Sequence, residues 1–341
     1  MGALPTSRVT IARPFSRVGL DYCGPIIIAT KKGRGAKYVK AYICVFVCMV
    51  TKAIHLEVAS DLTTDAFIAA LKRFIARRGL PREINSDNAT NFVGANRKLN
   101  QFYYQINNIN KSSTISDYLH DKGITWKFIP PVSPNFGGVW EAAVKSMKAH
   151  LIRVTGNSNL TFEEMTTLTC QIEAILNSRP LCQIKSDDPS SIDVLTPGHF
   201  LIMSPLTSLP QPDFEEVKNN RLTRWEQITK RIGSFWKRYS QDYLHTLQQR
   251  SKWQQQQKDL QIDDIVLVKE DNLPPCEWLK ARITDVHPGK DGLVRVVTLR
   301  TSKSTMKRPV NKIVQFIYTT VCMHSTSNVL VHCNQSSFNK L

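Results

Sequence analysis

The sequence predicts an α/β fold in which helices flank a mixed sheet, followed by a helical connector and a small β-barrel. Short β-rich runs follow one another near the N-terminus, and the apolar spacing then changes to the period of a helix. A middle region rich in Trp, Arg and Gln keeps helical spacing. Alternation of apolar and polar residues returns from Asp264 to Val314, which indicates short strands. Such a succession of strands and helices is typical of helices packed on a mixed sheet.

Three strands at short spacing open the chain and predict an antiparallel meander. The motif DYCGP is expected to end the first strand after Asp21, because Gly24 and Pro25 are strand breakers. The basic segment KKGRGAK, residues 31–37, is the expected tip of a hairpin. The three strands are expected at residues 17–21, 38–48 and 54–58.

Helical spacing follows the third strand. The segment TTDAFIAALKRFIARRG predicts a helix that Gly79 and Pro81 end. The segment VWEAAVKSMKAHLIRV predicts an amphipathic helix, and Thr161 with Glu164 forms a capping box that opens another. Between these helices we expect a short strand at 83–87, a polar stretch with helical patches at 95–122 and a strand at 124–129.

The second half is expected to be helical over residues 213–257 and to end in a barrel. Four alternating segments supply the barrel strands: DIVLVKED, LKARITDV, LVRVVTLRT and MKRPVNKIV. The Asp291-Gly292 pair is a turn signal between the second and third of them. Residues 317–341 have no apolar period and are expected to be irregular.

The charge balance points to a polyanionic partner. Lys and Arg total 45 of the 341 residues against 28 Asp and Glu, which gives a formal net charge of +17. A membrane is the weaker choice, because the longest apolar run, Ala41 to Val50, is about half the roughly 20 residues of a spanning helix. The N-terminal residues have no apolar stretch typical of an export signal. Composition therefore favours nucleic acid.

Three acids stand at the ends of elements that can adjoin in one sheet. Asp21 ends the first expected strand, Asp87 ends the strand after the first helix, and Glu141 lies in the first turns of a later helix. Three carboxylates placed together repel one another, and Mg²⁺, which prefers carboxylate oxygens, removes that conflict. Two such ions about 3.5–4 Å apart suit phosphodiester chemistry. Taken singly, Asp21 could be a turn residue, Asp87 could form an Asx-turn, and Glu141 could be an acid that the helix dipole favours.

The segments around these acids resemble the integrase of Bel/Pao-type LTR retrotransposons. The resembling segments include VGLDYCGP, INSDNATNFVGANRKLNQF, FIPPVSPNFGGVWEAAVKSMKAHL, ILNSRPL, LTPGHFLI, WKRYSQDYLHTLQQRSKW and EDNLPPCEWLKARITDVHPGKDGLVRVVTLRT. The resemblance covers roughly residues 4–315. It implies a ribonuclease-H-like core whose catalytic carboxylates are Asp21, Asp87 and Glu141. Between Asp87 and Glu141 lie 53 residues (141 − 87 − 1), more than in retroviral integrases, and the polar stretch accounts for the excess.

The resemblance also implies the activity and the division of the chain. We expect metal-dependent 3′-end processing and DNA strand transfer with two Mg²⁺ or Mn²⁺ ions, DNA and further copies of the chain as partners, no membrane, and a nuclear location. A catalytically idle DNA-binding protein and a nuclease of the same fold are the alternatives. The expected parts are a linker at 1–14, the integrase core at 15–185, a helical connector at 186–262, a small SH3-like barrel for DNA binding at 263–316 and an irregular tail at 317–341.

Further residues are candidates for DNA contact. Lys145 and Lys148 follow Glu141 by four and seven positions, so they share its helix face and can hold a phosphate backbone, with a solvated helix face as the alternative. Asn91, four residues after Asp87, is expected near the scissile phosphate, with a turn-stabilising role as the alternative. In the barrel, either DNA contact or a solvated basic face explains Arg295, Arg300, Lys307 and Arg308.

The cysteines indicate no zinc site. Cys44 and Cys48 share one face of the second strand and are expected to be buried free thiols. The tail holds Cys322, His324, His332 and Cys333, but the adjacent His332 and Cys333 are poorly spaced as ligands. We therefore expect no zinc in this chain.

Overall fold

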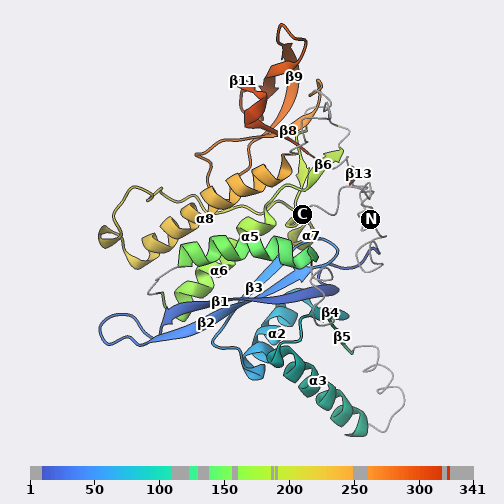
Figure 1. Ribbon diagram of the computed structural model, residues 1–341, viewed down its shortest axis with the longest axis vertical. Coiled ribbons are helices and arrows are strands. Elements are labelled where there is room, and N and C mark those ends of the chain that lie inside the picture. Colours follow the sequence, from blue (N-terminus) through green and yellow to red (C-terminus); the bar gives the residue numbers. More distant parts are fainter. Residues whose placement is uncertain are drawn as a thin grey trace. The chain divides into compact units, whose positions relative to one another are not determined.

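The computed structural model describes residues 10–109, 123–129, 138–155, 160–185, 188, 191–248, 260–316 and 321–322. Of residues 106–109, 138–146, 185 and 321–322 it describes only the backbone. The chain forms two compact units, one of residues 1–176 and 223–231 and the other of residues 177–222 and 232–341. Each unit contains a five-stranded sheet (Figure 1). This arrangement confirms the predicted α/β fold class.

The sheet of the first unit is mixed, with strand order β3-β2-β1-β4-β5. The first three strands form the predicted antiparallel meander, while β4 runs parallel to β1 and β5 parallel to β4. The buried Cys44 and Cys48 thiols lie in β2, as expected. The strands are β1 (Arg17–Ala29), β2 (Tyr38–Cys48), β3 (Ile54–Ala59), β4 (Glu83–Ser86) and β5 (Thr125–Phe128).

The first strand is longer than predicted. It does not end at Asp21 but continues to Ala29, because a register shift between Cys23 and Ile26 absorbs the Gly-Pro pair as a bulge. Gly24 has a φ of +142°, and a Cβ at this position would lie 2.9 Å from the Tyr42 ring. Asp21 is therefore an interior residue of a long strand and lies before the bulge.

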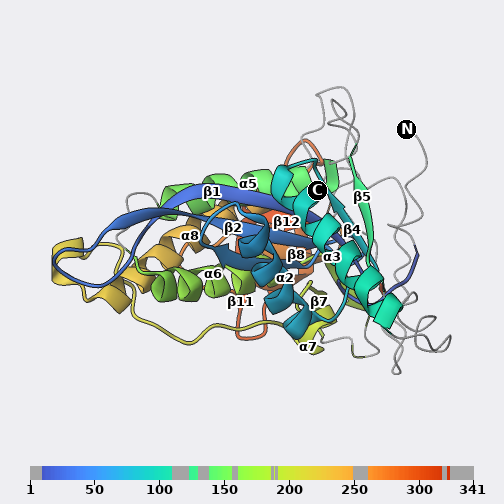
Figure 2. The ribbon, with the colours of Figure 1, turned by 90° about the horizontal axis from the view of Figure 1, so that it is seen from below.

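Helices cover both faces of this sheet. Helices α2 (Thr64–Arg78) and α3 (Thr90–Ile109) lie on one face, which Figure 2 views from below, and α5 (Gly138–Thr155) and α6 (Phe162–Asn177) lie on the other. None of the described helices is both long and apolar enough to cross a membrane. Aromatic rings fill the α2 side, where Phe46 stacks on Phe74 with centroids 4.3 Å apart.

Capping chemistry sets the helix ends as the sequence predicts. The Thr63 hydroxyl accepts the Ala66 N–H at the start of α2, and Gly79, with a φ of +83°, ends it. At the start of α6 the Thr161 N–H donates to the Glu164 carboxylate at 2.8 Å. These contacts confirm the capping box of Thr161 and Glu164.

The long helix α8 (Arg224–Leu247) begins later than the predicted position 213. The Thr223 N–H donates to the Glu226 carboxylate at 2.7 Å, a cap that the Trp, Arg and Gln content does not reveal. The Arg224 guanidinium donates to the fully buried Glu164 carboxylate at 2.5 and 2.7 Å and, as the main cause, lowers the pKa of Glu164 to about 2. This ion pair joins the first turns of α8 to the unit that contains the mixed sheet.

In the second unit, the segment predicted as a small β-barrel forms a five-stranded antiparallel sheet, with strand order β11-β10-β9-β8-β12. Its core includes Val266, Ile283 and Leu299, and Gly292, with a φ of +76°, lies in the turn between β9 and β10. The strands are β8 (Ile265–Val268), β9 (Lys280–Pro288), β10 (Val294–Arg300), β11 (Thr305–Pro309) and β12 (Ile313–Gln315).

A small three-stranded sheet completes the second unit. It consists of β6 (Cys182–Lys185), β7 (Val194–Leu195) and β13 (Val321–Cys322). The short helix α7 (His199–Ile202) comes after β7 in the chain. Strand β13 belongs to the tail that was expected to be irregular, so that expectation is wrong at these two residues. The backbone of Cys322 is described, while His324, His332 and Cys333 lie outside the described residues.

Candidate active site

Strand alternation turns Asp21 toward α5. Its neighbour Tyr22 packs on the opposite face, with its ring stacked on Phe92 at 5.4 Å between centroids and edge-on to Phe67. Adjacent residues of a strand point to opposite faces. The Asp21 side chain therefore points to the face that α5 covers.

The pairing of β1 with β4 brings the two aspartates toward each other. The parallel register joins Arg17 with Glu83 and Gly19 with Asn85, an offset of 66 residues in both pairs (83 − 17 and 85 − 19). If the same offset continued two residues beyond the last pair, it would set Asp21 opposite Asp87 (21 + 66). Asp87 directly follows the last residue of β4 and is exposed.

Asp87 also makes the turn contact that its sequence context suggested. One carboxylate oxygen accepts the Ala89 N–H at 3.1 Å, just before α3 begins. The neighbouring Asn88 amide donates to the carbonyl of Ile129 at 2.7 Å, which ties this turn to the end of β5. A turn role and a metal-binding role are compatible, because a carboxylate has two oxygens and this side chain is exposed.

Both oxygens of the Asp21 carboxylate have partners. Oδ1 accepts the backbone N–H of Tyr22 at 2.7 Å, and Oδ2 lies 2.7 Å from the Nζ of Lys148 on α5. The side chains of Asp21 and Lys148 are 27% and 26% exposed, so the ion pair is partly shielded from water. The lysine predicted to contact DNA thus touches a candidate metal ligand. We refer to Asp21, Asp87 and Lys148 as the Asp21 site.

The donors of this site suit a hard divalent cation. Asp21 and Asp87 supply carboxylate oxygens from neighbouring strands, and the Lys148 ammonium shows that Asp21 Oδ2 already attracts a cation. Helix α5 contains Glu141, whose side chain lies outside the described residues. Among the side chains that are described, no three Cys, His, Asp or Glu residues gather as a metal site.

The other predicted contacts of the core lie in different surroundings. Asn91 is only 5% exposed, and its side-chain oxygen accepts the Phe92 N–H at 3.0 Å. The pKa of the neighbouring Tyr22 is raised, mainly by burial. A role for Asn91 near the scissile phosphate stays a prediction. The side chain of Lys145 lies outside the described residues.

The four predicted basic residues of the C-terminal sheet separate into two groups. Arg300 and Lys307 are exposed and have no ion pair among the described residues. Arg295 pairs with Asp291 at 2.6 Å, and Arg308 lies 3.4 Å from Glu270. Arg300 and Lys307 are therefore the two whose charges stay available to a polyanion.

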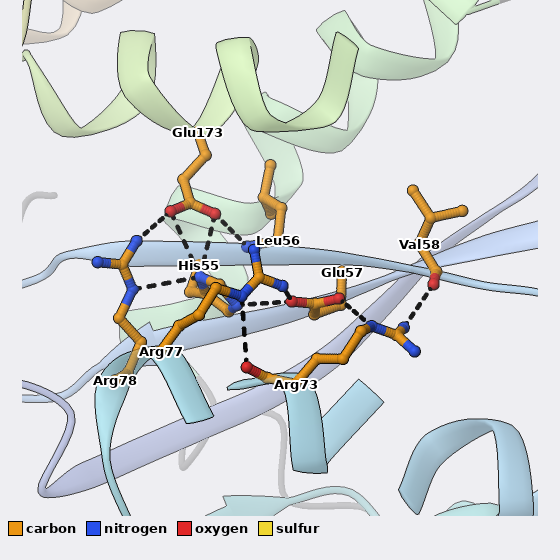
Figure 3. A network of polar contacts seen from close by, with 8 residues as sticks. All are labelled: His55, Leu56, Glu57, Val58, Arg73, Arg77, Arg78 and Glu173. Atoms are coloured by element: carbon orange, nitrogen blue, oxygen red, sulfur yellow. Dashed lines mark hydrogen bonds and ion pairs between the residues drawn. The ribbon is translucent and has the colours of Figure 1, made fainter. Parts of the chain in front are cut away.

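A second polar cluster, which the sequence did not predict, lies at the open edge of the same sheet. In Figure 3 the β3 residues His55 and Glu57 lie between arginines of α2 and Glu173 of α6. His55 is fully buried, and its Nε2 lies 2.9 Å from Glu57. We call this group the β3 edge cluster; it comprises His55, Glu57, Arg73, Arg77, Arg78 and Glu173.

The β3 edge cluster satisfies the backbone of the edge strand. The Leu56 N–H donates to Glu173 at 2.9 Å, and Arg73 donates to the Val58 carbonyl at 2.9 Å. Edge strands expose such groups unless side chains cover them. An acid two residues after a strand histidine was a detectable signal, because both share one face. The contribution of Glu173, 118 residues from His55, could not be read from the sequence.

Carboxylates lie near both ring nitrogens of His55: Nε2 is 2.9 Å from Glu57, and Nδ1 is 3.1 Å from Glu173. Burial favours the neutral imidazole; in the tautomer with its proton on Nε2, Nδ1 can accept the Nε–H of Arg78 at 3.3 Å and makes no hydrogen bond to Glu173. Burial lowers the pKa of His55 and outweighs the opposing hydrogen bond with Glu173. Burial would raise the pKa of Glu173, but His55, the Leu56 N–H and Arg78 together lower it.

Two segments of the chain match known protein families. Residues 12–134 match the integrase core domain, and residues 223–316 match a family of unknown function, DUF5641. No curated protein matches the chain. Asp21 and Asp87 both lie within the first segment, and Arg295, Arg300, Lys307 and Arg308 lie within the second.

Among solved structures, the chain is similar to one in a cryo-EM structure of a simian T-cell lymphotropic virus intasome in complex with PP2A regulatory subunit B56 gamma. The sequences are 13% identical, the likeness covers 91% of this chain and 82% of that chain, and the TM-score is 0.33. The segment that carries Asp21 and Asp87 is similar to an integrase core domain, with the mixed sheet of the ribonuclease-H-like fold.

Proposed function

We propose that this chain is a retroelement integrase of the Bel/Pao type, which trims the 3′ ends of element DNA and joins them to target DNA. The observation that supports the proposal is the parallel β1–β4 pairing, which ends two residues before Asp21 and Asp87 inside the segment that matches the integrase core domain. Glu141, on α5 with Lys148, is the third proposed catalytic carboxylate.

The proposed chemistry needs cations at the carboxylates. Two Mg²⁺ or Mn²⁺ ions, when bound, would stabilise the attacking and leaving oxygens of an in-line phosphoryl displacement. Asp21, Asp87 and Glu141 would hold them, and the lysines of α5 would neutralise phosphates of the DNA end. Water in end trimming and a 3′-hydroxyl in joining are nucleophiles of one reaction class, so one site serves both steps.

The remaining surfaces support a partner of high negative charge. The net charge of +17 suits DNA, and the exposed Arg300 and Lys307 are proposed to add contacts from the C-terminal sheet. Assembly of several copies on the DNA and action in the nucleus are part of the proposal.

A strand-transfer assay tests the proposal. The full chain is incubated with labelled duplexes that carry the terminal sequence of a Bel/Pao-type element and with an unlabelled target duplex, in Mg²⁺, Mn²⁺ or EDTA. We expect shortened 3′ ends and joined products with either metal and none in EDTA. DNA binding without any product would favour the idle DNA-binding protein, and cleavage without joining would favour the nuclease.

A further inference from the structure

The ion pair between Lys148 and Asp21 occupies the oxygen that a metal would need. Asp21 Oδ1 is held by the Tyr22 N–H, a backbone donor fixed by the strand. Oδ2 is the oxygen left for a cation, and the Lys148 ammonium lies 2.7 Å from it. A divalent ion and an ammonium at one carboxylate oxygen repel each other, so the two cations compete.

We propose that Lys148 is an internal counter-ion of the Asp21 site, which metal binding displaces toward a DNA phosphate. The inference rests on the proposed function, because it assigns the competing cation to the integrase metal site. Without metal, the ammonium neutralises Asp21. When metal takes Oδ2, the ammonium is released on its flexible four-carbon stem.

The position of Lys148 suits this exchange. Its backbone stays fixed in α5, whose neighbouring Met147 and Leu151 are fully buried, so only the side chain has to move. The Lys148 side chain is 26% exposed and has a route to solvent. Asp21 is its one ion-pair partner among the described residues, so the displaced charge is available to a phosphate. Metal and DNA then bind cooperatively, because the metal frees a DNA contact.

The first experiment measures Mn²⁺ binding to the DNA-free protein from the electron paramagnetic resonance signal of unbound Mn²⁺. Lys148→Met should bind Mn²⁺ about fivefold more tightly than the parent, since no ammonium has to be displaced. Lys72→Met is the matched control: Lys72 is an exposed helical lysine of α2, and its loss changes the net charge equally. It should leave the affinity within about twofold of the parent.

The second experiment measures DNA affinity between about 50 and 200 mM salt, with and without Ca²⁺, a hard cation for the same oxygens. Adding Ca²⁺ should make the slope of log K against log salt steeper in the parent than in Lys148→Met. The two changes in slope should differ by roughly 0.9, the effect of one added phosphate contact. Comparing the two proteins removes the direct effect of Ca²⁺ on DNA.

The possible outcomes separate this inference from the proposed function. Tighter Mn²⁺ binding by Lys148→Met together with the slope difference supports the exchange. Equal Mn²⁺ affinities of the parent and Lys148→Met would overturn the exchange and leave the metal site intact. If Asp21→Asn bound Mn²⁺ as tightly as the parent, or if none of these proteins bound it, the metal site itself would be wrong.

Discussion

The Asp21 site and the β3 edge cluster both place carboxylates on the same mixed sheet, yet they use them differently. In the β3 edge cluster the carboxylates are nearly covered, with Glu57 5% and Glu173 11% exposed, and are surrounded by arginines, His55 and backbone groups. At the Asp21 site the one ion pair among the described side chains is with a flexible lysine, and Asp87 is exposed. Carboxylates surrounded by fixed partners stabilise a fold, whereas carboxylates with replaceable partners can bind a ligand.

The largest expected effect is a loss of strand-transfer activity, without a matching loss of stability, on substitution of the aspartates of the Asp21 site. Asp21→Asn and Asp87→Asn each keep the side-chain shape but remove a metal-binding charge. Strand transfer should fall by at least about 10³-fold, which corresponds to about 4 kcal/mol of transition-state stabilisation. The unfolding free energy should change by less than about 1 kcal/mol. The strand-transfer assay and urea unfolding measure the two effects.

Asp65→Asn is the control for these variants. Asp65 lies in the first turn of α2, its side chain is 81% exposed, and its partner is Lys98, outside the Asp21 site. It should retain the activity of the parent. Near-full activity of both Asp21→Asn and Asp87→Asn with Mg²⁺ would show that the carboxylates are wrongly assigned.

The fold was predictable where local chemistry decides it. Apolar periodicity predicted the meander and the helices, and the capping box of Thr161 and Glu164 fixed the start of α6. The extension of β1 past Gly24 was not predictable, because a bulge depends on the partner strand. The start of α8 at Arg224 was not predicted, because the Trp, Arg and Gln composition does not locate a helix start. The cap at Thr223 sets that start.

The site was predictable only in part, for a similar reason. Asp21 and Asp87 were predicted from their positions on or next to two strands, and these strands, β1 and β4, are neighbours in the sheet. The contact of Lys148 with Asp21 spans 127 residues and depends on how α5 packs. The contacts of His55 were not predictable, since its partners Arg78 and Glu173 come from two separate helices.

The second prediction tests whether the β3 edge cluster stabilises the fold, by removing the Glu173 side chain that joins it to α6. Glu173→Ala removes the acceptor of the Leu56 N–H and a partner of His55 and Arg78. Breaking such a buried network should cost about 3–5 kcal/mol of unfolding free energy. Glu163→Ala, an exposed acid of the same helix, should cost under about 1 kcal/mol. Equal losses in urea unfolding would mean that the cluster does not stabilise the fold.

The third prediction concerns pH and His55. Its pKa is lowered in the folded protein, so below the unfolded value near 6.5 the unfolded chain binds a proton that the folded chain does not. The stability that His55 contributes is therefore complete above about pH 6.5 and falls as pH decreases, by at most about 1.4 kcal/mol per pH unit. Unfolding free energies between pH 8 and pH 5 measure this loss, above the range in which Glu173 titrates.

The control is His55→Gln, which keeps a buried side chain that can hydrogen-bond but cannot titrate. The difference in stability between the parent and this variant should shrink as pH falls from 8 to 5. A difference that stays constant with pH would show that His55 is not held neutral, and the proposed contact between its Nδ1 and Arg78 would be wrong.

The smallest expected effect compares one cation from each region. Lys148→Met removes an ion pair in which both partners are about one quarter exposed, and such pairs contribute about 0–1 kcal/mol. Arg78→Met removes a cation from the nearly buried Glu173 and from His55, so its loss of unfolding free energy should be larger, about 2–3 kcal/mol. Urea unfolding of both variants at pH 7 measures the contrast. A loss above about 2 kcal/mol for Lys148→Met would mean that this lysine is fixed in the fold, and a fixed lysine could not be the cation that metal displaces from Asp21.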